Sequence, residues 1–389
     1  MSKQHAKLSP SAAARWINCP GSVQLAALCP APPSTPYADE GTLAHTLAEL
    51  KLRDFDSDAG LSGVLLDKWQ EVHADPMYCG EMEEATDYYR DLVTERLIEA
   101  GPDAILLVEQ RFSLEAWVPE CFGTADAVII GGDAIEVIDL KYGKGVKVSA
   151  IGNPQTRLYG LGAAVMFSDL YDLNTVRMTI VQPRLDHVST EELPLLDLFK
   201  WAETVVKPAA LEAVDRTIEP RTACGDWCRF CPAKATCRTR AEKNLELARY
   251  EFQKPALLTK DEIAEILRQL DEFQHWTADV SEYALSQALQ GEKYDGWKLV
   301  EGRSVRKYAD DLKVAAALQE AGYPEAVLYE RKLLGISAME KVVGKKKLTE
   351  TLGDLIVKPA GKPVLVPESD KREAISTTEA ARSDFAGEA

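Results

Sequence analysis

The stretch between residues 105 and 181 constrains the fold of this chain more than any other part of the sequence. It contains four runs of β-branched and aromatic residues with the length of strands, and one segment of helical length before the last run. Gly131-Gly132-Asp133, between the second and third runs, is a turn sequence that joins antiparallel strands. The runs cover residues 105–112, 122–130, 134–140 and 176–181, and the helical segment covers 154–166. This order predicts an α/β fold with a mixed central sheet flanked by helices.

Apolar residues at helical spacing predict further helices on both sides of this segment. Leu43, Leu47 and Leu50 form the apolar stripe of a helix that opens at Asp39 or Glu40. We expect other helices over residues 9–28, 80–100 and 260–290. A chain of 389 residues is long enough for one large domain with an appendage. The expected organisation is a main domain over residues 1–253, a mostly helical region over 254–357, and a flexible tail over 358–389 that is rich in Pro, Ser, Thr, Ala and charge.

The composition is that of a globular protein without a membrane span. Apolar residues make up 46% of the chain, but no apolar run reaches the roughly 18 residues that a spanning helix needs. Residues 1–10 are polar and lack the apolar stretch of a signal peptide, so we expect the protein in a reducing cytoplasm. Eight cysteines in such a compartment suggest metal ligation before disulfides.

The charge of the chain argues against nucleic-acid binding by the protein as a whole. The formal net charge is −17, whereas a duplex attracts protein mainly through Lys and Arg. The local distribution is different. Residues 140–168 carry four basic and no acidic residues, residues 229–254 carry seven against three, and residues 331–347 carry six against one. These islands are either solvated faces or surfaces that follow a phosphate backbone.

Two carboxylates and a lysine stand at the ends of neighbouring expected strands. Asp126 lies on the second run, and Asp139 and Lys141 end the third, where alternation places them on one face. Converging carboxylates repel each other unless a divalent cation lies between them, and oxygen ligands suit Mg²⁺ or Mn²⁺. Lys141 would then orient or deprotonate an attacking water, or stabilise the charge that develops on a scissile phosphate. An Asp-x-Lys tripeptide alone is weak support, because it occurs by chance at many strand ends.

Gln155 and Tyr159 strengthen this interpretation, because they lie four residues apart on the helix that follows. With them the sequence resembles the RecB-like PD-(D/E)XK nucleases, over roughly residues 9–250. The signature of that family is a helix histidine, a Gly-x-x-Asp motif, an (Asp/Glu)-x-Lys strand and a Gln-x-x-x-Tyr helix, in this order. The resemblance implies a restriction-endonuclease-like fold in which metal ligands, a lysine for the water and DNA-positioning residues converge. These are His45, Asp126 and Asp139 for the metal, Lys141 for the water, and Gln155 and Tyr159 for DNA.

Glu109 on the first expected strand has two readings of equal weight. It is either an outer ligand of the same metal or a strand carboxylate satisfied by its neighbours.

The cysteine spacing points to a metal site near residue 230. Cys228, Cys231 and Cys237 form a C-x2-C-x5-C array, and Cys224 precedes it by four residues. Four local thiolates would suit zinc. The alternative takes Cys19 as the fourth ligand, which resembles the iron-sulfur nucleases among the CRISPR-associated RecB-like exonucleases and the AddB-type helicase-nucleases. That resemblance implies a 4Fe-4S cluster on Cys19, Cys228, Cys231 and Cys237 that joins the two ends of the domain. Cys29, Cys79 and Cys121 have no partner spacing and are expected to be buried apolar residues.

Three further segments, residues 16–22, 41–45 and 297–303, make the chain resemble a phage-borne or prophage-borne family. This implies a DNA exonuclease that resects ends for replication and recombination, with a phage single-strand-binding or annealing protein as partner. Two alternatives remain at the level of sequence. One is a non-catalytic DNA-binding or recombination scaffold, and the other is a zinc-stabilised protein whose helical C-terminal region binds a replication factor.

Overall fold

A computed structural model describes residues 7–30, 35–56, 60–246 and 258–298, with single positions at 313, 319, 344 and 347. The chain divides into two compact units, Met1–Gln287 and Ala288–Ala389. The architecture that follows is that of the first unit. The segments expected at residues 331–347 and 358–389 lie outside the described residues, apart from Gly344 and Lys347.

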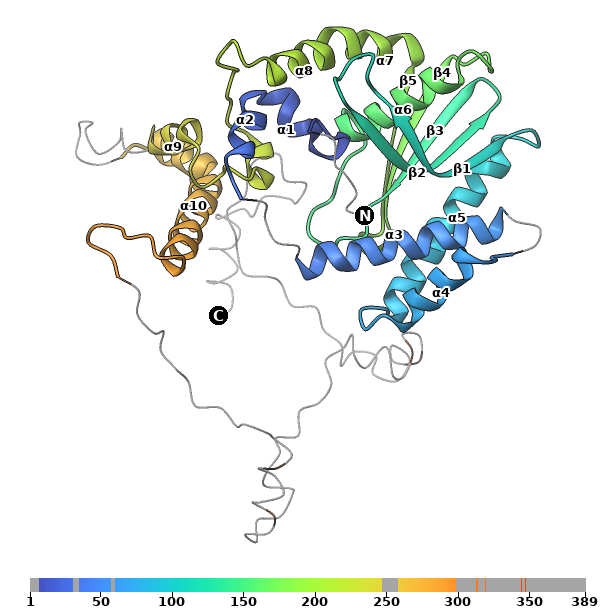
Figure 1. Cartoon of the computed structure of the whole chain (residues 1–389), viewed down its shortest axis with the longest axis horizontal. Coiled ribbons are helices and arrows are strands. Elements are labelled where there is room, and N and C mark those ends of the chain that lie inside the picture. The colour runs from blue at the N-terminus through green and yellow to red at the C-terminus, as the bar shows by residue number, and fades with distance from the viewer. Residues whose placement is uncertain are drawn as a thin grey trace, which may run out of the picture. The chain divides into compact units, whose positions relative to one another are not determined.

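A five-stranded mixed sheet forms the centre of the unit (Figure 1), as the sequence predicts. Its strands lie in chain order: β1 (Ile105–Ser113), β2 (Phe122–Gly131), β3 (Ala134–Leu140), β4 (Thr175–Gln182) and β5 (His187–Pro194). The β3–β4 pair is parallel and the other three pairs are antiparallel. The first four strands begin and end within about one residue of their expected bounds, a difference smaller than the usual uncertainty at element ends. The sequence analysis missed β5, a strand that exposes every second residue and carries two glutamates.

One face of the sheet is covered by α3 (Pro36–Phe55) and α5 (Gly80–Glu99), with α4 (Val64–Ala74) packed against α3. The opposite face packs against α6 (Pro154–Phe167), α7 (Leu195–Trp201) and α8 (Lys207–Val214), together with the N-terminal helices α1 (Ala13–Asn18) and α2 (Gly21–Ala27). Apolar residues of both sheet faces are thereby removed from water, which is the main stabilising contribution in such a fold.

Short helical turns and two C-terminal helices complete the unit. The remaining elements are the turns η1 (Pro10–Ala12), η2 (Pro183–Leu185) and η4 (Asp226–Phe230), the π-helical turn η3 (Ala202–Val206), and the helices α9 (Arg238–Leu245) and α10 (Lys260–Leu289). The helix expected over residues 9–28 is interrupted, because Cys19 leaves the helical conformation with φ −137° before Pro20. The α10 helix confirms the expected helical C-terminal region over its described part. Among the described residues, no helix combines the length and apolar character of a membrane span.

Candidate functional site

Asp126 and Asp139 face each other at the end of the β2–β3 pair. The regular pairing stops at Ala127 and Ile138, so the two aspartates occupy the next step of the antiparallel register. On its other edge β2 pairs with β1, and this pairing is interrupted at Glu109 of β1, between the paired residues Val108 and Gln110. Glu109 has a positive φ of 52°, a conformation that non-glycine residues adopt rarely and that gathers at functional sites. The backbone is therefore irregular on both sides of Asp126.

This irregularity decides where Asp126 points. Ala125 and Val128 lie on either side of Asp126, and both belong to the core on the α6 face although they are three positions apart. The alternation of side chains along β2 therefore shifts by one residue at this point. Asp126 is thereby directed to α3, where its Oδ1 lies 3.1 Å from His45 Nδ1. Its Oδ2 accepts a hydrogen bond of 2.8 Å from the Leu140 N–H, which replaces the missing ladder bond.

Asp139 and Lys141 instead meet the side chains of α6. The Lys141 ammonium lies 2.8 Å from Asp139 Oδ2 and donates a hydrogen bond of 3.1 Å to Gln155 Oε1. The Gln155 amide donates in turn to Asp139 Oδ1 at 3.4 Å and to the Tyr159 hydroxyl at 3.2 Å. The structure therefore assembles the predicted residues in two adjoining groups, with His45 and Asp126 in one and Asp139, Lys141, Gln155 and Tyr159 in the other.

Two local features of the sequence fix α6 in this position. Asn153 caps the helix by accepting hydrogen bonds from the N–H groups of Gln155 and Thr156, and Pro154 occupies the first turn. Gly123 gives Tyr159 its space, since a Cβ atom there would lie 2.7 Å from Tyr159 Cε1. The glycine of the Gly-x-x-Asp motif thus has a packing role against the tyrosine of the Gln-x-x-x-Tyr motif.

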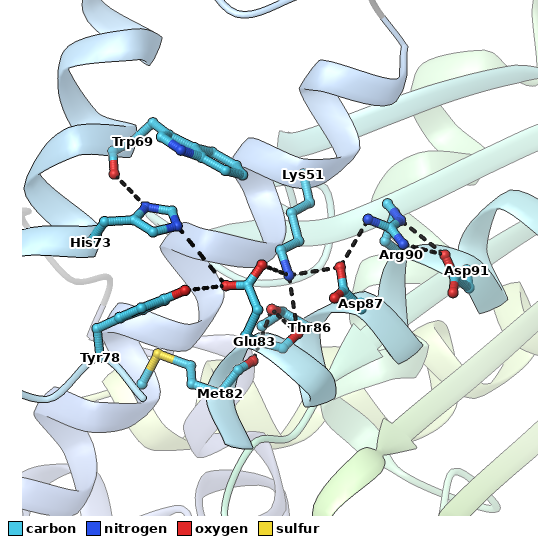
Figure 2. A network of polar contacts seen from close by, with 10 residues as sticks. All are labelled: Lys51, Trp69, His73, Tyr78, Met82, Glu83, Thr86, Asp87, Arg90 and Asp91. Atoms are coloured by element: carbon cyan, nitrogen blue, oxygen red, sulfur yellow. Dashed lines mark hydrogen bonds and ion pairs between the residues drawn. The ribbon is translucent and has the colours of Figure 1, made fainter. Parts of the chain in front are cut away.

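Two residues that no sequence pattern singles out hold the helices around the site. The buried Tyr89 of α5 donates a hydrogen bond of 2.8 Å to the carbonyl of Ile138, directly before Asp139. Lys51 of α3 is buried with 3% of its side chain exposed, and its ammonium contacts Glu83 Oε1 and Asp87 Oδ1 of α5 at 2.8 Å each (Figure 2). A lysine on an amphipathic helix normally predicts a solvated position, so no pattern in the sequence indicates this network, which joins the helix of His45 to α5.

The electrostatics of the site follow from burial and from the two ion pairs. Burial alone would lower the pKa of His45, but the Asp126 carboxylate outweighs it and the net pKa is raised. Burial raises the pKa of Asp139 despite the neighbouring Lys141 ammonium. The pKa of Asp126 is lowered, because the attraction to His45 outweighs the desolvation of the carboxylate. The pKa values of the two carboxyl groups are thus shifted in opposite directions from the ordinary value of an aspartate, as expected where two acids share a buried site.

A divalent cation fits the chemistry of this site, although its ligands are not gathered in the described structure. No three His, Cys, Asp or Glu side chains within the described ranges stand close enough together to hold a metal ion. The reason is the shift at Asp126, which directs the two carboxylates to different helices. However, Asp139 Oδ2 is buried, and its partner among the described residues is the Lys141 ammonium at 2.8 Å. A buried carboxylate oxygen of this kind is a suitable ligand for Mg²⁺ or Mn²⁺.

The cysteine segment lies against the N-terminal helices. The Gly21 N–H donates to the Arg221 carbonyl at 2.9 Å, and a Cβ atom on Gly21 would lie 2.7 Å from Thr222 Cγ2. This close approach places Cys19 Sγ 3.3 Å from the Ala223 N–H, which donates to it. Cys19 therefore lies next to the cysteine segment although it is more than two hundred positions away in the sequence.

The thiols of this segment are reduced and closely spaced. Cys224 Sγ and Cys228 Sγ are 4.0 Å apart, and the Cys224 thiol lowers the pKa of Cys228 to about 6. Cys228 begins a turn that brings the Cys231 N–H to its carbonyl at 3.1 Å, and Cys237 caps α9. Of the two fourth-ligand alternatives, Cys224 thus contacts a thiol of the array and Cys19 contacts the backbone next to Cys224. Within the described ranges no three of these cysteines stand close enough together to hold a metal.

The remaining cysteines follow the sequence expectation in part. Cys121 is buried, and its thiol lies 2.9 Å from the Leu8 carbonyl. The expectation of burial was wrong for Cys79, which is exposed, and Cys29 is half-buried. Cys79 directly precedes α5, where the chain turns at the surface, so its neighbours do not cover it.

Comparison with known proteins places the chain in a family. Residues 5–373 match the family described as protein of unknown function DUF2800, and the chain belongs to that family. Among solved structures, one titled "Crystal structure of SSO0001" is similar at 16% sequence identity, covering 50% of this chain and 85% of that chain with a TM-score of 0.22.

Proposed function

We propose that this chain is a divalent-metal-dependent DNA nuclease of the RecB-like PD-(D/E)XK class, acting as an exonuclease on DNA ends. The observation that carries this proposal is the shared location of Asp126, Asp139, Lys141 and Gln155 at one end of the β2–β3 pair. Ordinary structural salt bridges do not require two acids, a lysine and a glutamine to come from adjoining strands and the following helix. Metal-dependent hydrolysis of a phosphodiester can use such a set, with the acids on the metal and the lysine beside the attacking water.

Each residue has a distinct task in the proposed reaction. Asp126, Asp139 and His45 would hold Mg²⁺ or Mn²⁺, with Glu109 as an outer carboxylate near them. When bound, the cation supplies a polarised phosphate oxygen and an acidified water. Lys141 orients the attacking water through its donors, and Gln155 keeps the Lys141 side chain in place through the 3.1 Å hydrogen bond. Tyr159, bonded to the Gln155 amide at 3.2 Å, positions the DNA strand with it.

We further propose a 4Fe-4S cluster on Cys19, Cys228, Cys231 and Cys237. The packing of Gly21 on residues 220–222 supports it, because this contact puts Cys19 beside the cysteine segment. A cluster there would close the two sequence ends of the nuclease domain onto each other. The proposed setting is resection of DNA ends in phage replication or recombination, in the bacterial cytoplasm, with a single-strand-binding or annealing protein as partner.

A nuclease assay on end-labelled single-stranded and double-stranded DNA tests the proposal. We expect cleavage with Mg²⁺ or Mn²⁺ and none with EDTA, and release of labelled mononucleotides or short products from one end. Protein that binds DNA but cleaves neither substrate with either metal would favour a non-catalytic recombination scaffold. A protein that neither binds nor cleaves DNA would overturn the proposed function altogether.

A further inference from the structure

A second cluster of charged residues lies at the same edge of the sheet as the proposed catalytic groups. Tyr142 directly follows Lys141, whose N–H donates to the Val181 carbonyl at 2.8 Å. Arg184 belongs to the η2 turn, three residues after Val181. Because β3 and β4 are parallel, both residues leave the sheet at the edge that carries Lys141. The Arg184 guanidinium lies 4.3 Å from the centre of the Tyr142 ring.

Two cations of this cluster converge on one half-exposed glutamate. Lys144 Nζ lies 2.5 Å from Glu81 Oε1, and Arg184 donates to Glu81 Oε2 at 2.9 Å. Arg184 also donates to Glu40 Oε1 of α3 at 3.2 Å. Glu81 thus bridges an arginine and a lysine with its two oxygens, which is the arrangement that a phosphate would also satisfy.

The cluster also holds donors that remain unused. The Tyr142 hydroxyl and Arg184 Nε are buried and have no hydrogen-bond partner among the described residues. Buried polar groups in this state carry a desolvation cost, and a bound ligand or ion is one explanation for them. Each of the two non-bridging oxygens of a phosphodiester can accept more than one hydrogen bond, so one phosphate could use these donors together with Lys144 and Arg184.

We propose that Arg184, Lys144 and Tyr142 form a binding subsite for a phosphodiester of the DNA strand, and that Glu81 occupies this subsite in the free protein. The inference rests on the proposed function. It gives the DNA strand a contact next to Lys141, at the cluster that begins with Tyr142. The loop that carries Lys144 is suited to this role. Residues 140–168 contain no acidic residue, and Gln182 fixes the loop by accepting from the Val148 N–H at 2.7 Å and donating to the Val146 carbonyl at 2.9 Å.

The test measures affinity for a fluorescent single-stranded oligonucleotide by anisotropy, with EDTA present to prevent cleavage. We expect Glu81→Gln to tighten binding by about 3- to 10-fold at low salt, because the variant no longer competes with the phosphate for Lys144 and Arg184. Glu99→Gln is the matched control. Glu99 lies on the same helix, also pairs with an arginine, and has 56% of its side chain exposed against 48% for Glu81. It is about 27 Å from Glu81 along the helix axis, so its charge is screened at the subsite.

Lys144→Gln supplies the opposite change at a side chain exposed enough to be replaced without loss of the fold. We expect weaker binding and a salt dependence flatter by up to about 0.7 in log–log slope, the contribution of one phosphate contact on a single strand. Inorganic phosphate at matched ionic strength should compete for the subsite and reduce the advantage of Glu81→Gln. If Glu81→Gln binds inorganic phosphate more tightly than wild type but gains no affinity for the oligonucleotide, the subsite takes free phosphate, and the proposed DNA contact is wrong.

The outcomes separate this inference from the proposed function. Wild-type protein that binds and cleaves DNA, with Glu81→Gln no tighter than Glu99→Gln and Lys144→Gln unchanged in affinity and slope, overturns the subsite alone. Wild-type protein that neither binds nor cleaves DNA overturns both. Should Glu81→Gln fail to fold, as judged by its melting temperature, the Lys144→Gln result decides.

Discussion

The carboxylate site and the cysteine segment of this protein are organised by different means. Asp126, Asp139 and Lys141 lie at the ends of paired strands, and each accepts or donates a hydrogen bond or ion pair of defined length. The cysteines lie on a short turn, at a helix cap and at a break between two helices, with one thiol pair at 4.0 Å. The sheet therefore positions the side chains of the first site through hydrogen bonds and ion pairs, whereas the positions of the cysteines depend on a turn and on helix ends. In neither region do three metal-ligating side chains gather within the described ranges.

This difference predicts that catalysis and folding respond separately to substitutions in the two regions. The largest expected effect is on the rate of DNA cleavage by the variant Asp139→Asn, which removes a buried charge from the proposed reaction centre. We expect a loss of at least about a thousandfold in DNA cleavage, because the loss of a charge clamp raises the barrier by several kcal/mol. Visible absorption and iron content should stay at the wild-type level.

Glu136→Gln is the control for this variant, since Glu136 is another buried carboxylate of β3, bonded to Thr179 at 2.7 Å and lying far from Lys141 along the strand. It should lose stability but cleave DNA at a rate within about threefold of wild type at a temperature where it is folded. Equal activity of Asp139→Asn and Glu136→Gln would remove Asp139 from the reaction centre.

The cysteine segment should show the reverse pattern. Cys228→Ser and Cys19→Ser should each bleach the protein and lower the free energy of unfolding by several kcal/mol, because one lost thiolate exposes the rest of the site. Visible spectra, iron content and chemical denaturation measure this. Cys79→Ser, at an exposed thiol that directly precedes α5, serves as control and should change none of these quantities.

Cys224→Ser distinguishes the two ligand sets. Full colour in Cys224→Ser with loss of colour in Cys19→Ser supports the long-range cluster. The opposite pair of results, in a colourless protein that contains zinc, would establish a local four-cysteine site and contradict the iron-sulfur proposal.

A smaller effect is expected at Gly123, where the motif contact between β2 and α6 can be tested without removing a charged group. Gly123→Ala places a Cβ atom 2.7 Å from Tyr159 Cε1 and 2.8 Å from Pro10 Cγ, so the Tyr159 ring must move. We expect a loss of about 1 to 3 kcal/mol in stability, the usual cost of overpacking, and weaker DNA binding. Gly143→Ala, where a Cβ atom meets nothing within 4 Å, is the control. Tyr159→Phe combined with Gly123→Ala should be no worse in binding than Gly123→Ala alone.

The regular elements of this fold can be predicted from the sequence, whereas the irregular positions and the tertiary contacts cannot. The first four strands and α6 were predictable because β-branched runs, the Gly131-Gly132-Asp133 turn and the Asn153-Pro154 cap are local signals. The direction of Asp126 was not, because the alternation of side chains along β2 shifts between Ala125 and Val128, which no local pattern indicates. The sequence predicts that antiparallel pairing places the two aspartates side by side. The structure keeps them opposite each other in the register but directs them to α3 and α6. The contact of Cys19 with Ala223 was likewise beyond local reasoning, since it arises from tertiary packing of Gly21.

The smallest expected effect concerns the loop between Lys141 and α6, and it changes only at acidic pH. Arg157 of α6 donates to both oxygens of Glu191 on β5, at 2.7 and 2.6 Å, and the Gly152 N–H donates to Glu191 Oε1 at 2.9 Å. Burial would raise the pKa of Glu191, which has 8% of its side chain exposed, but these donors outweigh it and the pKa is lowered from 4.5.

Because its pKa is lower in the folded state, Glu191 contributes stability above its unfolded pKa and loses it as the pH falls through the folded value. We therefore expect wild type to exceed Glu191→Gln in unfolding free energy by about 1 to 3 kcal/mol at pH 7, the usual contribution of hydrogen bonds to a charged group. The difference should stay constant down to about pH 5 and shrink below pH 4.5. Denaturant titrations of both proteins at pH 7 and pH 4 measure it, with Glu192→Gln, at the neighbouring exposed glutamate of β5, as control. A difference that is the same at both pH values would show that Glu191 stabilises the loop by shape and not by its charge.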